Sequence, residues 1–126
     1  MIIMGEKKIL VVDDKEVNRD LYRDLLKRKG YDVHSAEDGR KAMSMLSREY
    51  GLVITDYDYP ERDEFLESVV ISYPTTPIIM ITGHSATDKK VVEAKNRFRI
   101  KEVIQKPITP INRLFEAVER HYTTSP

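Results

Sequence analysis

The sequence predicts a single α/β domain built on a doubly wound, five-stranded parallel sheet with five helices. Short apolar segments rich in β-branched residues alternate with longer segments in which apolar residues recur at helical spacing. Such alternation implies parallel strands joined by right-handed crossovers, with helices on both faces of the sheet. The length of 126 residues suits one domain over residues 1–126, with a core expected at about residues 7–121.

The strand prediction rests on short apolar segments that end at polar residues. The first reads KILVV, which is typical of a strand buried on both faces of a parallel sheet. LVIT and PIIMIT repeat that character, whereas the second segment is more mixed and the fifth is very short. The expected strands span residues 8–12, 31–36, 52–55, 77–82 and 103–105.

The helix prediction rests on apolar spacing and on capping residues. In the first helix the apolar face includes Val17, Leu21 and Leu26, and Gly30 follows at the position of a C-cap glycine. Thr109 is placed to cap the last helix, whose first turn then accepts a proline. The expected helices span residues 16–29, 38–49, 61–72, 87–98 and 110–121.

Composition limits the classes of partner. The 21 Lys and Arg residues balance 21 Asp and Glu residues, so net charge gives no reason to expect a nucleic acid or an acidic membrane as partner. The absence of cysteine excludes disulfides and thiolate metal sites, and it fits a reducing compartment such as the cytoplasm. The brief apolar start is interrupted by GEKK before a signal-peptide core or a membrane span could form.

Polar residues with chemical potential follow the predicted strands. The first strand ends at Asp13 and Asp14, the third at Asp56 and the fourth at Thr82, and the fifth runs into Lys106. Ligand sites of doubly wound sheets lie at the carboxyl ends of the strands, beside the point where strand order reverses. These five residues are therefore the candidate site.

Three carboxylates gathered at one edge require positive charge. Two like charges about 4 Å apart repel by roughly 4 kcal/mol at an effective dielectric constant near 20. Mg²⁺ suits an all-oxygen set with few protein ligands, and Lys106 supplies a second counter-charge. A carboxylate beside Mg²⁺, a lysine and a hydroxyl is equipped for phosphoryl transfer, with Asp56 as the nucleophile.

This arrangement resembles the receiver domain of two-component response regulators, and the likeness covers nearly the whole chain. It implies a flavodoxin-like sheet with strand order 2-1-3-4-5. The family's Mg²⁺-binding acidic pair falls on Asp13 and Asp14, and its aspartate that accepts a phosphoryl group from a histidine kinase falls on Asp56. Its phosphoryl-binding hydroxyl and lysine fall on Thr82 and Lys106.

The resemblance carries further expectations. The backbone carbonyl of Asp58 is implied as another Mg²⁺ ligand beside the Asp56 carboxylate, and the Lys106-Pro107 peptide bond is implied to be cis. The expected partners are a sensor histidine kinase or phosphotransfer protein and a downstream protein effector, with the chain a monomer or weak homodimer. Its only catalysis would be its own phosphorylation and dephosphorylation.

The chain departs from the family pattern near the site. Residues 57–64 read YDYPERDE, with Glu64 where a glycine is usual, which puts the turn before the third helix in question. Val103 occupies a position that commonly carries Tyr or Phe, so a rotating ring cannot report phosphorylation there. The segment RFRIK at residues 97–101 also replaces a Gly-Ala segment; its charges are interpreted as a solvated face.

Two other functions fit parts of the pattern. A pseudo-receiver would keep the fold and act as an interaction or dimerisation module without phosphorylation, as Val103 and the altered loop allow. A small Mg²⁺-dependent phosphatase also uses an aspartate at a strand end, but 126 residues leave little room for a cap or substrate pocket. His84 is interpreted as a polar surface residue, and Tyr57 and Tyr59 as packing residues that shape access to Asp56.

Overall fold

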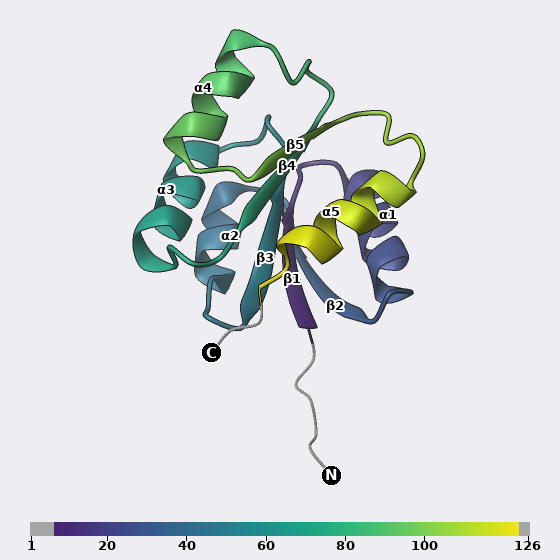
Figure 1. The fold of residues 1–126 in the computed structure, drawn as a ribbon. Helices are drawn as coiled ribbons and strands as arrows, with labels where there is room; N and C mark the ends of the chain where they lie inside the picture. The colour runs from purple at the N-terminus through teal and green to yellow at the C-terminus, as the bar shows by residue number, and fades with distance from the viewer. Residues whose placement is uncertain (1–6, 124–126) are drawn as a thin grey trace.

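The computed structural model describes residues 7–123 and confirms the predicted sheet. Five parallel strands are arranged in the order β2-β1-β3-β4-β5 (Figure 1). Chain order reverses at β1, which lies between β2 and β3. The strands are β1 (Lys7–Val12), β2 (Tyr31–Ala36), β3 (Tyr50–Thr55), β4 (Ile78–Thr82) and β5 (Glu102–Gln105).

Five helices cover the two faces of the sheet, which gives the predicted doubly wound, three-layer arrangement (Figure 1). Buried side chains of α1 and α5 pack on one face, and those of α2, α3 and α4 pack on the other. The helices are α1 (Glu16–Lys27), α2 (Gly39–Met45), α3 (Arg62–Ser72), α4 (Lys89–Arg97) and α5 (Asn112–His121).

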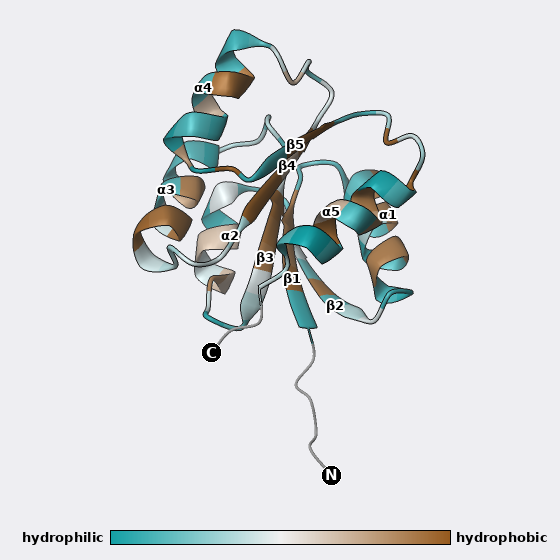
Figure 2. Ribbon diagram, in the orientation of Figure 1, coloured by the Kyte–Doolittle hydropathy of each residue, from teal (hydrophilic) through white to brown (hydrophobic). Residues whose placement is uncertain are grey.

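Alternation along the central strands builds two hydrophobic clusters. In β1, Ile9 and Val11 face α1 and α5, whereas Leu10 and Val12 face the other three helices, and all four are fully buried. Both faces of this strand are covered, which explains its continuous apolar sequence. Figure 2 shows the same contrast, with brown central strands between helices that turn teal faces outward.

The apolar face predicted for α1 is partly wrong. Tyr22 and Leu26 are buried against the sheet, but Val17 is 72% exposed and Leu21 is 49% exposed. Val17 and Leu21 are four residues apart and share one row of the helix, while Tyr22 and Leu26 form the adjacent row that contacts the sheet. A spacing pattern alone could not tell which of these two rows is buried.

Several predicted helix ends also differ from the structure. α2 ends at Met45 because Leu46 adopts an extended conformation, and Tyr50 already pairs with β1. Thr109 does not cap α5, which begins at Asn112, because backbone carbonyls of residues 110 and 111 accept the hydrogen bonds of its first amides. α1 also ends earlier than predicted, at Lys27 with Arg28 as its C-cap, so Gly30 lies two residues beyond the cap and has its φ of 92° in the turn before β2.

None of the helices within residues 7–123 is long and apolar enough to cross a membrane.

The start of α2 is fixed against the loop before α3. The amide of Gly39 donates to the Pro60 carbonyl at 2.8 Å, and Glu61 has a left-handed φ of 59°. A Cβ at position 39 would lie 2.0 Å from the Glu61 carbonyl oxygen, far inside van der Waals contact. Only glycine therefore permits this approach of two backbones.

We expect Gly39→Ala to lower the free energy of unfolding by about 1–3 kcal/mol, as overpacking against backbone does. The measurement is urea unfolding followed by circular dichroism. Gly83→Ala is the matched control, because a Cβ there meets nothing within 4 Å. Equal stability of the two variants would contradict the steric assignment.

Candidate functional site

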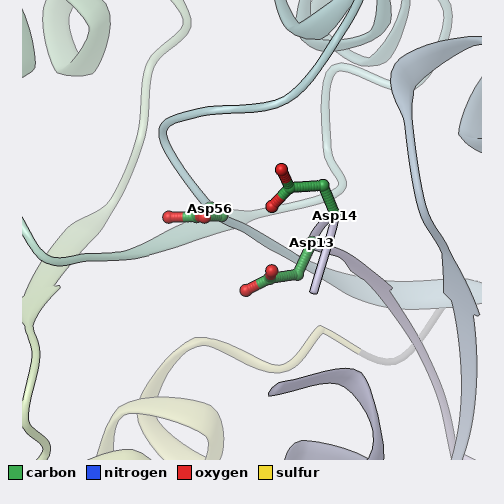
Figure 3. A group of neighbouring side chains, drawn as sticks. All are labelled: Asp13, Asp14 and Asp56. Atoms are coloured by element: carbon green, nitrogen blue, oxygen red, sulfur yellow. The ribbon is translucent and has the colours of Figure 1, made fainter. Parts of the chain in front are cut away.

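Three carboxylates meet at the carboxyl end of the sheet. Asp13 and Asp14 follow β1, and Asp56 follows the neighbouring strand β3. One ligand oxygen from each of the three residues lies within 4.8 Å of the others (Figure 3). Asp13 is buried and Asp14 is exposed, so the cluster is open to solvent on one side.

The Asp13 carboxylate is held by the beginning of α1. The backbone amide of Lys15 donates to Oδ1 at 2.9 Å, and the side-chain amide of Asn18 donates to Oδ2 at 3.2 Å. The Arg19 guanidinium also donates to the backbone carbonyl of Asp13 at 2.8 Å. Asp13 therefore has a fixed orientation, which the sequence did not indicate because Asn18 and Arg19 look like ordinary surface positions of a helix.

Lys106 provides the positive charge next to the cluster. Its Nζ lies 3.7 Å from Asp13 Oδ2 and 3.7 Å from Asp56 Oδ1. The backbone amide of Tyr57 donates to Asp56 Oδ1 at 2.7 Å. Both groups stabilise the ionised form of Asp56.

The pKa of Asp56 is nevertheless raised above the usual value of an aspartate. Burial is the largest cause, and the charges of Asp13 and Asp58 act in the same direction. The Tyr57 amide and the Lys106 ammonium lower the pKa but do not offset burial and repulsion. The carboxylate is thus held in a site that disfavours its negative charge until more positive charge arrives.

A backbone hydrogen bond connects Lys106 to Thr82. Thr82 ends β4 and is fully buried, and the amide of Lys106 donates to its carbonyl at 2.8 Å. The Thr82 hydroxyl accepts a hydrogen bond from the His84 amide at 3.1 Å. The Lys106-Pro107 peptide bond is cis, as the family resemblance implies.

The side chain of Asp58 is directed to His84. Its carboxylate lies 2.8 Å from His84 Nε2, and the imidazole packs edge-on against the Tyr57 ring at 4.9 Å between centroids. His84 is an exposed polar residue, as expected, but it also joins the loop after β3 to the loop after β4, which the sequence did not indicate. The coordinating role of the Asp58 carbonyl stays a prediction.

Arg62 fixes the loop that follows Asp56. Its guanidinium donates to the Tyr57 carbonyl at 2.8 Å, lies over the Tyr57 ring at 4.4 Å, and pairs with Asp63 at 2.7 Å. Asp63 also accepts a hydrogen bond from Arg97 of α4 at 3.3 Å. The loop is thus connected to α3 and α4, a role that sequence inspection did not assign to any of these residues.

The altered loop avoids strain at the position that replaces glycine. Glu64 lies in the first turn of α3, and the left-handed residue is Glu61 instead. Tyr59 is partly buried, and its hydroxyl lies 2.7 Å from Thr55 Oγ1. The Tyr59 ring packs against the hydrophobic cluster, as expected, and burial raises the pKa of its hydroxyl.

Comparison with known proteins decides the family. The family model for the response regulator receiver domain matches residues 9–119. The chain belongs to this family. A chain-length relative, an uncharacterized 14.6 kDa protein from Leptolyngbya boryana, is 30% identical over 131 residues and covers 100% of this chain and 98% of its own.

Solved receiver structures show the same fold. The signal receiver domain of an HD domain-containing protein from Pseudomonas fluorescens Pf-5 has a TM-score of 0.83 and 30% identity, covering 93% of this chain and 94% of its own. The response regulator protein TrrA from Thermotoga maritima, solved in complex with Mg²⁺-BeF, has a TM-score of 0.74 and 28% identity, covering 90% of this chain and 97% of its own.

The donor set of this receiver domain fits Mg²⁺. The clustered ligand atoms of Asp13, Asp14 and Asp56 are all carboxylate oxygens, the hard donors that Mg²⁺ prefers. Exposure of Asp14 leaves room for the water ligands that Mg²⁺ retains. A divalent cation would also relieve the repulsion that contributes to the raised pKa of Asp56.

The raised pKa of Asp56 predicts a pH effect on stability in metal-free buffer. Between its usual pKa and its raised folded pKa, the folded receiver domain binds more protons than the unfolded chain, so this group makes the free energy of unfolding fall as pH rises. Below this window the effect is absent, and above it the effect is complete. We therefore expect Asp56→Asn to be more stable than the wild type at pH 7 and to lose this part of the pH dependence.

The measurement is urea unfolding of both proteins in EDTA at several pH values from 4 to 8. This range begins near the ordinary carboxyl pKa of about 4 and extends upward through the expected window. A constant stability difference across this range would contradict the assigned pKa shift.

Proposed function

We propose that this receiver domain is a phosphorylation-dependent switch that accepts a phosphoryl group on Asp56 from a sensor histidine kinase or phosphotransfer protein. The observation that carries the proposal is the position of Lys106, whose Nζ is 3.7 Å from both Asp13 and Asp56 within a cluster of three carboxylates. A cation beside a partly buried carboxylate is what an incoming phosphoryl group requires.

In the proposed step, one Oδ of Asp56 attacks the phosphorus of a phosphohistidine. An O–P bond forms, the P–N bond breaks, and the departing imidazole nitrogen retains the electron pair and takes a proton from solvent. The Lys106 ammonium and the Thr82 hydroxyl bind the phosphoryl oxygens, while the Tyr57 amide orients the Asp56 carboxylate through the 2.7 Å hydrogen bond. Later attack by water on phosphorus releases inorganic phosphate and resets the switch.

Asp13, Asp14, Asp56 and the Asp58 carbonyl are the groups proposed to hold Mg²⁺. When bound, the ion neutralises negative charge on the carboxylates and on the transferred phosphoryl group. TrrA supports this assignment, because that similar receiver protein was solved in complex with Mg²⁺-BeF. The fixed orientation of Asp13, with both carboxylate oxygens hydrogen-bonded, keeps one ligand in place.

The proposed output is a shift between two packings around β4, β5 and α4, read by a downstream protein effector. Phosphorylation adds nearly two negative charges at Asp56. It is expected to favour the packing in which the Thr82 hydroxyl lies closer to the phosphoryl oxygens. Val103 packs into the core and offers no ring to rotate. A displacement of Thr82 is instead expected to reach the neighbouring loops through the backbone. The amide of Lys106 donates a hydrogen bond to the Thr82 carbonyl, and the amide of His84 donates one to the Thr82 hydroxyl.

Val103 favours a second candidate, a pseudo-receiver that docks or dimerises without phosphorylation. The Asp58–His84 contact also fits this alternative, since it connects two loops of the site through their own side chains. Retention of Asp56, Thr82 and Lys106 favours the switch.

The direct test is intact mass spectrometry after incubation with Mg²⁺ and acetyl phosphate. We expect a mass gain of one phosphoryl group that requires Mg²⁺ and is lost in Asp56→Asn. Asp24→Asn is the matched control, because it removes an exposed carboxylate of α1 outside the cluster and should be phosphorylated like the wild type. No gain in the wild type, together with no NMR response to beryllofluoride, would favour the pseudo-receiver.

A further inference from the structure

A cavity lies at the end of the sheet opposite the aspartates. It has a volume of about 500 Å³ and is bounded by the amino-terminal ends of β4 and β5 and by the carboxyl-terminal ends of α3 and α5. Ile78, which begins β4, forms part of its wall, whereas Thr82 at the other end of the same strand belongs to the phosphorylation site. The cavity is therefore separate from the proposed switch chemistry.

Three basic side chains line the cavity, and two of them have no carboxylate partner among residues 7–123. Arg99, Lys101 and Arg120 line it, and Arg120 is paired with Glu102 at 2.6 Å. His121 also binds Glu102, at 2.8 Å, so this carboxylate is already shared by two partners. Within residues 7–123, no carboxylate lies within ion-pair distance of Arg99 or Lys101.

Both of these cations are held on fixed backbone. Arg99 has a left-handed φ of 54°, and the turn around it is closed by a hydrogen bond from the Ile100 amide to the Lys95 carbonyl at 2.9 Å. The Lys101 amide donates to the Ile78 carbonyl at 2.8 Å, which fixes it at the end of the sheet. Two cations, two residues apart in sequence, are thus presented by one turn with fixed backbone.

The inner wall of the cavity is apolar. Val69, Ile78 and Phe98 close its floor, but each is at most 2% exposed and offers almost no surface to a ligand. The apolar surface that a ligand can reach comes from the half-buried Val70 and Tyr73 and from the exposed Pro74. Tyr73 adds an aromatic ring with a polar group at the side. A volume of this size lies within the range of small-molecule sites, which are mostly apolar with a few fixed polar groups.

We propose that this cavity binds a small organic anion, with an apolar body against Val70, Tyr73 and Pro74 and an acidic group, carboxylate or phosphate, at Arg99 and Lys101. The positive charges of Arg99 and Lys101 favour a ligand with an acidic group, and the apolar wall favours a ligand with an apolar part. Inorganic phosphate alone would leave the apolar surface uncovered, and a neutral ring would leave the two cations without a partner. The proposal does not depend on phosphorylation of Asp56.

The test is an NMR titration of the ¹⁵N-labelled protein with 1-naphthoate as the probe and 1-naphthylmethanol as its neutral counterpart. We expect saturable shifts at amides of residues 73–78, 98–101 and 120–123, with a dissociation constant on the order of 1 mM, as for a fragment-sized ligand. The neutral compound should bind at least about tenfold more weakly, since it loses the charge-assisted contacts. Absence of saturable shifts at these amides, or equal binding of both compounds, would overturn the proposal.

Variants assign the binding to the two cations. Arg99→Glu combined with Lys101→Glu should weaken naphthoate binding by at least about tenfold, and Arg40→Glu combined with Lys41→Glu is the matched control on exposed positions of α2. Arg99→Asn with Lys101→Gln tests the same point without charge reversal, because asparagine tolerates the left-handed backbone. Unchanged affinity in this milder variant would contradict the assignment.

Discussion

The carboxylates of Asp13, Asp14 and Asp56 have ligand oxygens within 4.8 Å of one another, at the edge of a largely apolar sheet. At such separations each like-charged pair repels by roughly 4 kcal/mol at an effective dielectric constant of 20. Lys106, the Tyr57 amide and the bonds from α1 to Asp13 offset part of this repulsion. Burial, as the largest cause, and the charges of Asp13 and Asp58 still raise the pKa of Asp56 above the usual value of an aspartate. The site is consequently adapted to gain positive charge.

The topology of the sheet makes this convergence unavoidable. β1 pairs with both β2 and β3, so the residues that follow β1 and β3 emerge side by side. β4 and β5 extend the same edge and bring Thr82 and Lys106 to it, with the Lys106 amide bonded to the Thr82 carbonyl. Continuous burial of the central strands fixes their register, because a slip would move their side chains to the wrong face. The register of the buried parallel strands therefore determines both the packing of the core and the geometry of the site.

The sequence predicted most of this framework because buried parallel strands have continuous apolar segments and the fold places polar strand ends together. It did not predict contacts that depend on side-chain direction. The spacing assigns both Val17 and Leu26 to the apolar face of α1, and only packing shows that Leu26 is buried and Val17 exposed. The contact of Asp58 with His84 joins residues 26 positions apart, and the bonds of Arg62 depend on the path of a loop that departs from the family pattern. No short-range signal encodes either arrangement.

The most direct test of the central claim is the effect of Mg²⁺ on unfolding of the unphosphorylated protein. Urea unfolding should be measured in EDTA and in saturating Mg²⁺ for the wild type and for Asp14→Asn, since the exposed Asp14 side chain makes no hydrogen bond or ion pair within residues 7–123. The account predicts that Mg²⁺ stabilises the wild type, by about 2.7 kcal/mol at a hundredfold excess over its dissociation constant. Asp14→Asn should lose most of this gain without losing stability in EDTA. Unfolding of the wild type that does not respond to Mg²⁺, or an undiminished response in Asp14→Asn, would contradict the account.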